Sequence, residues 1–518
     1  MAITSVPKKL ETHHLLEEVT LARPFWEYYE IFRNEPYSFL LDSARKSETL
    51  AKFSFLGGNP ELIYEAHRIP GAAPADGAKI TVTRRRTETG AELNPPVVEN
   101  KIADVFEDLD RLFDRHRVER ESLGELPIPL IAGAVGYFAY ECNYLIEKLP
   151  DRGKDDLALP VVTLMFVDRL LAHDHRTGRN YVSTMGRGAT AAEAKANAEK
   201  YRDELMARVA HHEKHPPEAW VGPDPDAPKV DVTVRAHADK ETYIRTVERA
   251  KDHIFQGNCF EVCTTHRLEA DFGGDPWDLY RELRRINPAP FACFLNLPGA
   301  HVVSSSPERF LSLSREGVVE TRPIKGTRPR GANKKEDQAL KQDLMTNPKD
   351  RAENVMIVDL VRNDIGRVCE IDSVHVPELT IVEEYATVFQ LVSTVRGQLR
   401  EDKNAIDLIK SGFPGGSMTG APKIESMKII DELEPYKRGI YSGGIGYLDV
   451  TGSMDFNIVI RTLVVKDGRC YFSVGGAIVA DSDPAGEYQE TIDKSAALVR
   501  AIEGTLRARQ SSRQGYGT

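Results

Sequence analysis

The chain has 518 residues, of which 41% are hydrophobic and 28% are charged, with 38 glycines and 30 prolines spread along its length. This composition excludes collagen-like, disordered and low-complexity proteins and indicates a globular protein of roughly two to four domains, or one large domain in two parts. Acidic residues outnumber basic ones by 79 to 68, and the net charge of −11 argues against nonspecific binding to nucleic acid or to an anionic membrane.

The six cysteines are scattered and show no metal-ligand spacing, which favours a reducing compartment over a disulfide framework. The N-terminal stretch MAITSVPKKLETHHLLEE lacks the apolar segment of a signal peptide. No run approaches the roughly 18 apolar residues that a membrane span needs. We therefore expect a cytoplasmic protein.

The first half of the chain predicts strands and then a helix. Strands are expected at SFLLDSA, KFSFLG, AGAVGYFAYE and LPVVTLMFVDRLLAHD. A helix is expected over 191–210, and the following stretch HHEKHPPEAWVGPDPDAPK contains five prolines that break regular structure. We expect an N-terminal region over 1–210, a linker or crossover over 211–235, a second region over 236–510 and a tail over 511–518.

The second region opens with a helix that Asp239 caps and that ends before Gly257. Strands are expected at CFEVCTTHRLEAD, FACFLNL, AHVVSSS and RFLSLSREGVVETRP, and again at GYLDV, MDFNIVIRTLVV and RCYFSVGGAIVA. Groups of strands with intervening helices predict a layered α/β or α+β fold.

Two helical stretches each carry a pair of acids on one face. Asp350 and Glu353 are three residues apart, as are Glu487 and Glu490, and Lys494 lies one turn further. Carboxylate oxygens from two helices suit a hard ion such as Mg²⁺. Taken alone, each helix is better explained as a solvated face with ion pairs, and the polar groups beside the apolar runs of both segments favour the metal site.

Two further side chains could take part in acid–base or nucleophilic chemistry. Lys325 lies in TRPIKGTRPRG, expected as a stiff loop, where an amine of lowered pKa could act as nucleophile or base. It could also be a surface lysine of a basic loop. Glu308 follows the predicted strand AHVVSSS and could be a general acid or a residue that forms a salt bridge.

Two glycine-rich segments could bind an anion through backbone amides. PGGSMTGAPK precedes a helix and could form an anion-receiving turn or an ordinary strand-to-helix turn. VGGAIVADSD exposes the amides of Gly475 and Gly476, or contains a β-bulge.

The motifs SSPERF, ETRPIKGTRPRG, KDRAENVMIVDLVRNDIGRV, FPGGSMTGAPK, SGGIGYLDVTGSMDFNIVIRTL and GGAIVADSDPAGEYQETIDK follow one another in this order. Together they resemble the chorismate-binding domain of the large subunits of anthranilate and aminodeoxychorismate synthases and of isochorismate and salicylate synthases. The resemblance covers about 236–507, and FLLDSA and AKFSFLG extend it toward the N-terminus. It implies a sandwich of two antiparallel sheets with helices outside, in which the N-terminal region contributes to both layers.

The resemblance also implies a site. Glu353 and Glu490 would bind Mg²⁺, and Asp350 and Glu487 would support them. The metal would hold the ring carboxylate of chorismate. The rest of the substrate would be bound by Gly326, Thr327, Ser417, Tyr441, Arg461, Gly475, Gly476, Ala477 and Lys494, with Ala477 in place of an expected glycine.

Lys325 distinguishes activities within this family. Anthranilate synthases that resemble this chain have PIAGT, whereas aminodeoxychorismate synthases have PIKGT, as here. The resemblance implies that Lys325 attacks C2 of chorismate while Glu308 protonates the departing C4 hydroxyl, and that ammonia then adds at C4. Because no glutaminase motif is found in the chain, a separate glutamine amidotransferase subunit would supply the ammonia. The alternatives are an anthranilate synthase component and a weakly catalytic, amino-acid-sensing partner of a glutaminase.

Two residues depart from the patterns of relatives. Glu261 stands where isochorismate and salicylate synthases have a lysine base, and Gln390 stands where many relatives have a histidine. Gln390 can hydrogen-bond but cannot exchange a proton as imidazole does.

A separate candidate pocket corresponds to the tryptophan site of anthranilate synthases. Its residues here are Ser43, Pro290, Phe291 and Ala292, and Asp42 replaces the usual glutamate before the serine. The sequence leaves open whether the pocket binds tryptophan or is filled by core side chains.

Overall fold

Two large sheets form the body of the protein. The computed structural model describes residues 10–45, 50, 52–119, 123–218, 220–224, 228, 230–384 and 388–515. Along the first sheet, the strands of the described residues follow in the order β1 (Glu11–Val19), β10 (Arg179–Gly188), β9 (Arg169–Asp174), β3 (Phe53–Gly57), β2 (Ser38–Asp42), β13 (Phe291–Leu297), β14 (Ala300–Ser306), β23 (Thr462–Lys466), β24 (Arg469–Ile478), β12 (Glu261–Asp271) and β11 (Val234–Ala236), with β20 (Gly420–Ala421) paired to β12.

The second sheet has a similar size. Its described strands follow in the order β17 (Ile324–Pro329), β19 (Val388–Gln398), β16 (Val318–Arg322), β15 (Arg309–Leu313), β22 (Met454–Ile458), β21 (Gly444–Asp449), β7 (Gly133–Phe138), β8 (Val162–Val167), β4 (Leu62–Arg68), β5 (Ala78–Arg86) and β6 (Glu92–Ala103), with β18 (His375–Glu384) paired to β19.

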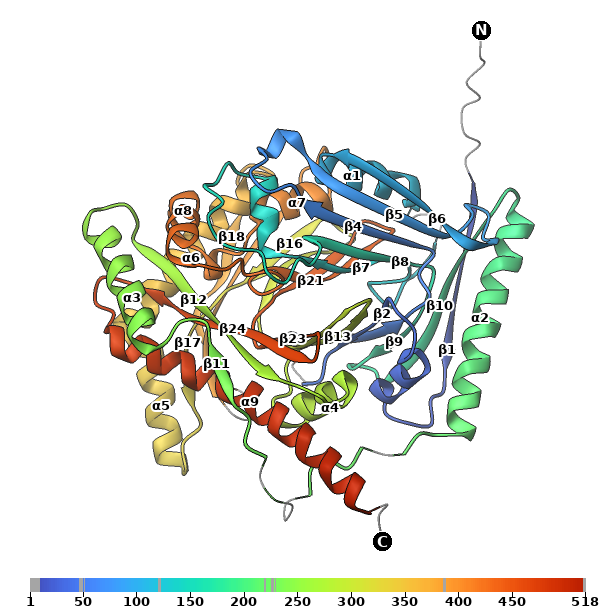
Figure 1. Ribbon diagram of the computed structural model, residues 1–518. Coiled ribbons are helices and arrows are strands. Elements are labelled where there is room, and N and C mark those ends of the chain that lie inside the picture. The colour runs from blue at the N-terminus through green and yellow to red at the C-terminus, as the bar shows by residue number, and fades with distance from the viewer. Residues whose placement is uncertain are drawn as a thin grey trace.

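Helices surround the sheets. They are α1 (Val105–His116), α2 (Ala191–Lys214), α3 (Lys240–Phe255), α4 (Pro276–Ile286), α5 (Lys334–Thr346), α6 (Pro348–Gly366), α7 (Ala405–Gly412), α8 (Lys423–Leu433) and α9 (Pro484–Gly515), with 3-10 turns η1 (Phe25–Phe32), η2 (Pro74–Asp76), η4 (Tyr140–Leu145) and η5 (Gly416–Met418). In Figure 1, α1 lies above the second sheet, and α4 and α9 lie below the first.

Side-chain alternation places one core on each face of the first sheet. Phe39 and Phe55 pack with residues of the second sheet such as Val135, in the space between the sheets. Their neighbours Leu40 and Leu56 point the other way and pack with side chains of η1, α2, α4 and α9. Because successive strand residues face opposite sides, the apolar runs of the sequence fill both cores.

In each sheet the strands of the chain's first half form one continuous block and those of the second half another, and the two blocks meet at a single ladder. β2 pairs with β13 in the first sheet, and β7 pairs with β21 in the second, both antiparallel. This confirms the expected fold of two antiparallel sheets with outer helices and an N-terminal contribution to both layers. Of the expected tail 511–518, α9 includes residues up to Gly515, and 516–518 lie outside the described residues.

Helix ends follow the sequence signals well. The side chain of Asp239 accepts a hydrogen bond from the Thr242 amide at 2.8 Å and caps α3, and Gly257 follows the helix with a φ of 80°. The strands that the sequence did not predict include β1, β4, β5, β6, β10, β18 and β19. Lys325, expected in a loop, lies in strand β17, because its segment pairs with β19 despite the neighbouring prolines.

No helix among the described residues has the length and apolarity to cross a membrane.

Candidate active site

The candidate residues converge where one end of the first sheet meets one end of the second. Strands β12 and β24 come from the first sheet and β17 from the second, and α6, α9 and η5 supply the remaining groups. Asn347 caps α6 by accepting the Asp350 amide at 3.1 Å, which fixes the first turn of the helix that carries two of the acids.

Lys325 is buried at the centre of this region, with 8% of its surface exposed. Its ammonium donates a hydrogen bond to Glu261 Oε1 at 2.8 Å. Burial alone would lower the pKa of Lys325, but the charges of Glu261 and Glu353 hold it above its usual value. The residue is therefore an ammonium in this arrangement, and the surface-lysine alternative is wrong.

Glu308 has the properties of a proton donor at neutral pH. It is buried after β14, and Ser417 of η5 hydrogen-bonds to its carboxylate. Burial raises the pKa of Glu308 to about 7, against the opposing effects of Ser417, Lys325 and Arg461. A carboxyl with that pKa is partly protonated near pH 7 and can give up its proton.

Arg461 provides a positive charge close to Glu308. Burial and the neighbouring Arg45 lower its pKa, yet an arginine stays charged. Within the described ranges its guanidinium makes no ion pair, so an anion could bind it. Tyr441 is also buried, with Cys263 and Arg438 among its titratable neighbours, and burial raises its pKa, so it remains a neutral hydrogen-bonding group.

The acids of α6 and α9 face each other. The ammonium of Lys349 lies 3.9 Å from Glu353 Oε1 and 4.0 Å from Glu487 Oε1. Burial raises the pKa of Glu353 to about 7 and also raises the pKa of Glu487. The Ser482 hydroxyl donates a hydrogen bond to Glu487 Oε1 at 2.7 Å. Carboxylates with raised pKa values beside one another are strongly stabilised by a cation.

Glu490 and Lys494 form the next part of the site. Lys494 Nζ lies 2.7 Å from Glu490 Oε1 and donates to the Gly475 carbonyl at 2.8 Å. Partial burial would raise the pKa of Glu490, but Lys494 holds it below its usual value. At Gly476 a side-chain Cβ would come within 2.8 Å of Glu487 Oε2, so glycine lets the backbone of β24 approach these acids.

The donor set fits Mg²⁺ in chemistry, because Glu353, Glu487 and Glu490 offer only oxygen ligands. Their ion pairs are with Lys349 and Lys494. Among the described residues, no three acidic, histidine or cysteine side chains are gathered as a ready metal-binding set. A metal would thus have to displace the lysine contacts.

Asp350 forms an ion pair with Arg328, and its charge also contributes to the raised pKa of Glu353. Its Oδ2 accepts from Arg328 at 2.7 Å, and its carboxylate lies against Gly326, where a Cβ would come within 2.9 Å of Oδ1. Gly326 has a φ of 83° and so suits this close approach. Thr327 pairs in register with Gln390 of β19, which places the buried Gln390 beside the segment PIKGT. Ala477 pairs with Cys263 of β12.

Two buried ion pairs that hold the site together were not identified from the sequence. Arg438 binds Glu434 at 2.6 Å and also donates to the Cys263 and Met418 carbonyls, each at 2.7 Å, which ties β12 to η5. Lys423 binds Asp364 at 2.6 Å and so joins two of the motifs, PGGSMTGAPK and VRNDIG. The only sequence signal was the presence of charged residues within apolar runs.

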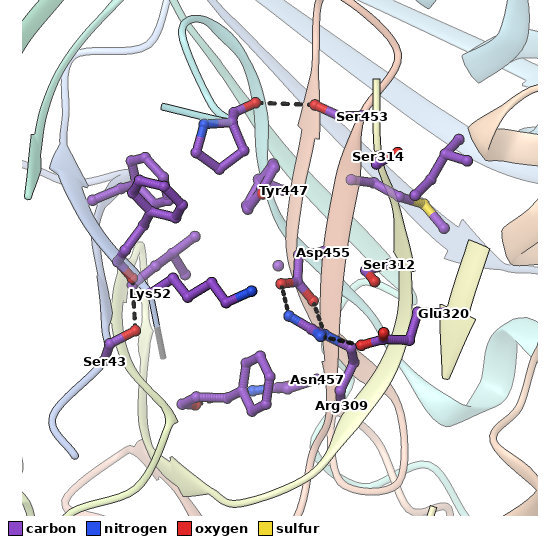
Figure 2. A pocket seen from close by; sticks show the side chains of 18 of the residues that line it. Ser43, Lys52, Arg309, Ser312, Ser314, Glu320, Tyr447, Ser453, Asp455 and Asn457 are labelled. Carbon is purple, nitrogen blue, oxygen red and sulfur yellow. Dashed lines mark hydrogen bonds and ion pairs between the residues drawn. The ribbon is translucent and has the colours of Figure 1, made fainter. Parts of the chain in front are cut away.

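The candidate tryptophan pocket is a real cavity of about 480 Å³, and all four of its predicted residues line it. Figure 2 shows Lys52 extending toward Asp455 and Arg309 inside it. Arg309 binds Asp455 and Glu320, each at 2.7 Å, and the Ser43 hydroxyl donates to the Phe53 carbonyl at 2.6 Å. The cavity is therefore not filled by core side chains.

Residues 70–500 match the family model described as chorismate binding enzyme, and the chain belongs to this family. This confirms the family predicted from the motifs. The chain is 41% identical over 487 residues to the aminodeoxychorismate synthase of Streptomyces griseus, in an alignment that covers 93% of the chain and 63% of that relative. The chain thus spans less than two thirds of that relative's length.

Two further proteins are similar over most of their length. The aminodeoxychorismate synthase component 1 of Klebsiella aerogenes is 43% identical over 376 residues, covering 73% of the chain and 78% of that protein. The crystal structure of anthranilate synthase component I from Streptococcus pneumoniae TIGR4 aligns with a TM-score of 0.69 and 30% identity, covering 88% of this chain and 93% of that one. Relatives with both names are therefore similar to this chain.

Proposed function

We propose that the chain is the chorismate-aminating subunit of an aminodeoxychorismate synthase. It would convert chorismate and ammonia to 4-amino-4-deoxychorismate, the precursor of 4-aminobenzoate in folate synthesis. The observation that carries this proposal is Lys325 in the PIKGT segment of β17. This lysine is buried, and its charge acts on Glu308. Relatives named aminodeoxychorismate synthase at 41% and 43% identity support it.

The chemistry needs a nucleophile and an acid. The lone pair of Lys325 Nζ forms a bond to C2 of chorismate, the diene electrons shift along the ring, and the C4–O bond breaks. Glu308 protonates the departing hydroxyl, which leaves as water. Ammonia then forms a bond to C4, the electrons return, and the C2–N bond to Lys325 breaks. Glu308 takes a proton from the added ammonium group and is restored. An alanine at position 325 could not form the adduct.

Around these two residues, the remaining groups would bind and orient the substrate. Arg461 is a charged group without an ion pair among the described residues, and it suits a substrate carboxylate. Mg²⁺ bound by Glu353 and Glu490, with Asp350 and Glu487 in support, would neutralise the acids and hold the ring carboxylate. The oxygen-only donor set and the raised pKa values of Glu353 and Glu487 support this part of the proposal.

A metal site can be tested without an activity measurement. Calorimetric titration of the protein with Mg²⁺ should show binding, and Glu353→Gln and Glu490→Gln should each weaken it. Equal Mg²⁺ affinity in both variants and the wild type would contradict the assignment of these ligands.

We also propose that a separate glutamine amidotransferase subunit supplies the ammonia. The name component 1 of the Klebsiella relative supports a second component, as does the greater length of the Streptomyces relative. The chain alone should then use ammonium but not glutamine.

The central test is the product. Purified protein with chorismate, Mg²⁺ and ammonium should give aminodeoxychorismate by liquid chromatography and mass spectrometry. In the absence of ammonia, intact mass should show a covalent adduct that Lys325→Ala lacks and that the exposed control Lys335→Ala on α5 retains. Anthranilate as the product would instead favour an anthranilate synthase component. The similarity to the Streptococcus structure supports this second candidate function.

For the cavity we propose an amino-acid ligand of the size of tryptophan. Its volume of about 480 Å³, its aromatic lining by Phe53, Phe55 and Phe291 and the charges of Lys52 and Asp455 support a zwitterion with an apolar side chain. Calorimetry with L-tryptophan should show binding. No heat at millimolar concentrations of tryptophan, tyrosine or phenylalanine would contradict this proposal.

A further inference from the structure

Glu261 is a buried acid that the proposed chemistry does not yet use. It begins β12, and none of its surface is exposed. Its carbonyl accepts from the Ser426 hydroxyl at 3.1 Å, and a Cβ at Gly420 would come within 2.1 Å of the same carbonyl. The backbone of Glu261 is therefore held closely between β20 and α8, which fixes the position from which its side chain extends.

The two carboxylate oxygens of Glu261 differ in their surroundings. Oε1 accepts the hydrogen bond of 2.8 Å from Lys325 Nζ. Oε2 is buried and has no hydrogen-bond partner among the described residues. Because buried polar atoms are normally paired, an acceptor left free beside a reactive amine indicates a place for a proton.

Lys325 requires such an acceptor. The contacts described above make it an ammonium, which has no lone pair and cannot attack C2. The proton on Nζ must leave before the bond to carbon forms. Burial slows the release of this proton to water, so a group in contact with Nζ offers the faster route.

We propose that Glu261 accepts the proton of Lys325 as chorismate reacts and returns it when ammonia expels the lysine. This inference rests on the proposed function. At the start Lys325 is an ammonium and Glu261 a carboxylate. The proton moves from Nζ to Glu261, and the free lone pair forms the bond to C2. When the C2–N bond breaks, Lys325 departs as a neutral amine and recovers its proton from Glu261. No outside acid or base is consumed.

The other charged groups around Lys325 are less suited to this role. Glu353 of α6 and Glu490 of α9 act on Lys325 through their charge, and neither makes a hydrogen bond to Nζ among the described contacts. Cys263 on β12 is buried, and burial raises its pKa. Glu308 must itself hold a proton to release the hydroxyl. This leaves Glu261, the group in contact, as the acceptor.

The test is the rate of adduct formation in a single turnover without ammonia, followed by acid quench and intact mass. The isosteric Glu261→Gln removes the acceptor but keeps the shape, and at pH 7 the adduct should form roughly 10²- to 10⁴-fold more slowly. The shape of the pH profile provides a second readout. In the wild type the transfer is internal, so the rate should be level up to about pH 7 and then fall tenfold per pH unit as Glu308 ionises.

In Glu261→Gln, Lys325 must lose its proton to solvent. The rate should then rise tenfold per pH unit up to about pH 7 and level off above it, where Glu308 loses the proton that the reaction needs. A purely structural role of Glu261 would lower the rate without changing the shape of the profile. Glu261→Asp, which keeps a carboxylate, should retain the wild-type shape and serves as the second variant if glutamine disturbs folding.

Glu282→Gln is a matched control, because Glu282 is also buried but binds Arg285 on α4, and it should leave rate and profile unchanged. A Glu261→Gln protein that forms the adduct at the wild-type rate or faster at pH 7, with the wild-type profile, overturns the inference alone. A wild-type protein that forms no adduct on Lys325 overturns the proposed function, and the inference with it.

Discussion

Glu308 should lower the stability of the folded protein when it ionises, and Glu308→Gln should remove this effect. Burial raises the pKa of Glu308 from 4.5 to about 7. At 1.36 kcal/mol per pH unit, this difference corresponds to about 3 kcal/mol of unfolding free energy. Because the pKa is higher in the folded state, the contribution is fully present below about pH 4.5 and is lost as the pH rises through 7.

The comparison needs urea unfolding of both proteins at pH 5 and pH 8.5. The stability of Glu308→Gln relative to the wild type should increase by about 2 to 3 kcal/mol between these values. The same variant should form the lysine adduct roughly 10²- to 10⁴-fold more slowly, because the amide cannot protonate the hydroxyl. Glu401→Gln, at an exposed turn, controls for the loss of a carboxylate. Parallel pH dependence of stability in the wild type and Glu308→Gln would refute the reasoning.

Three other substitutions test the scaffold and the substrate contacts. Lys423→Met leaves the buried Asp364 without its partner at 2.6 Å and should lower the unfolding free energy by about 3–5 kcal/mol in urea; an unchanged urea midpoint would contradict this. Gly326→Ala places a Cβ within 2.9 Å of Asp350 at a φ of 83°, and it should lower both the thermal midpoint and kcat/KM; wild-type values for both would show that the segment yields freely. Arg461→Gln should raise the KM for chorismate roughly 10- to 100-fold in steady-state kinetics, and an unchanged KM would remove Arg461 from the binding site.

The local parts of the fold were predictable because their signals lie close together in the sequence. The cap at Asp239, the acid-bearing helices and the alternating strands follow from neighbouring residues. Strand β17 was missed, because its pairing with β19 depends on a segment that is distant in the sequence and overrides the prolines. Sequence patterns describe such distant partners poorly.

For the candidate site, too, the residues could be predicted from the sequence but their distant contacts could not. Lys325, Glu308 and the two acid pairs were found as residues, but their contacts were not. The bond between Lys325 and Glu261 joins strands of different sheets, and no spacing in the sequence encodes it. The supporting role of Asp350 at the metal stays a prediction, whereas its contact with Arg328 was not predicted. Charged partners inside a fold depend on three-dimensional packing, which determines both their distance and their burial.

The single ladder that joins the two halves in each sheet has a consequence for dissecting the protein. A cut between α2 and β11 would break no strand pair, because the ladders β2–β13 and β7–β21 hold the pieces together from the inside. Either piece made alone would expose the edges of β2 and β7, or of β13 and β21, as templates for aggregation. A chain that is cleaved there after folding should therefore keep its fold. Two fragments that are produced separately should not fold independently.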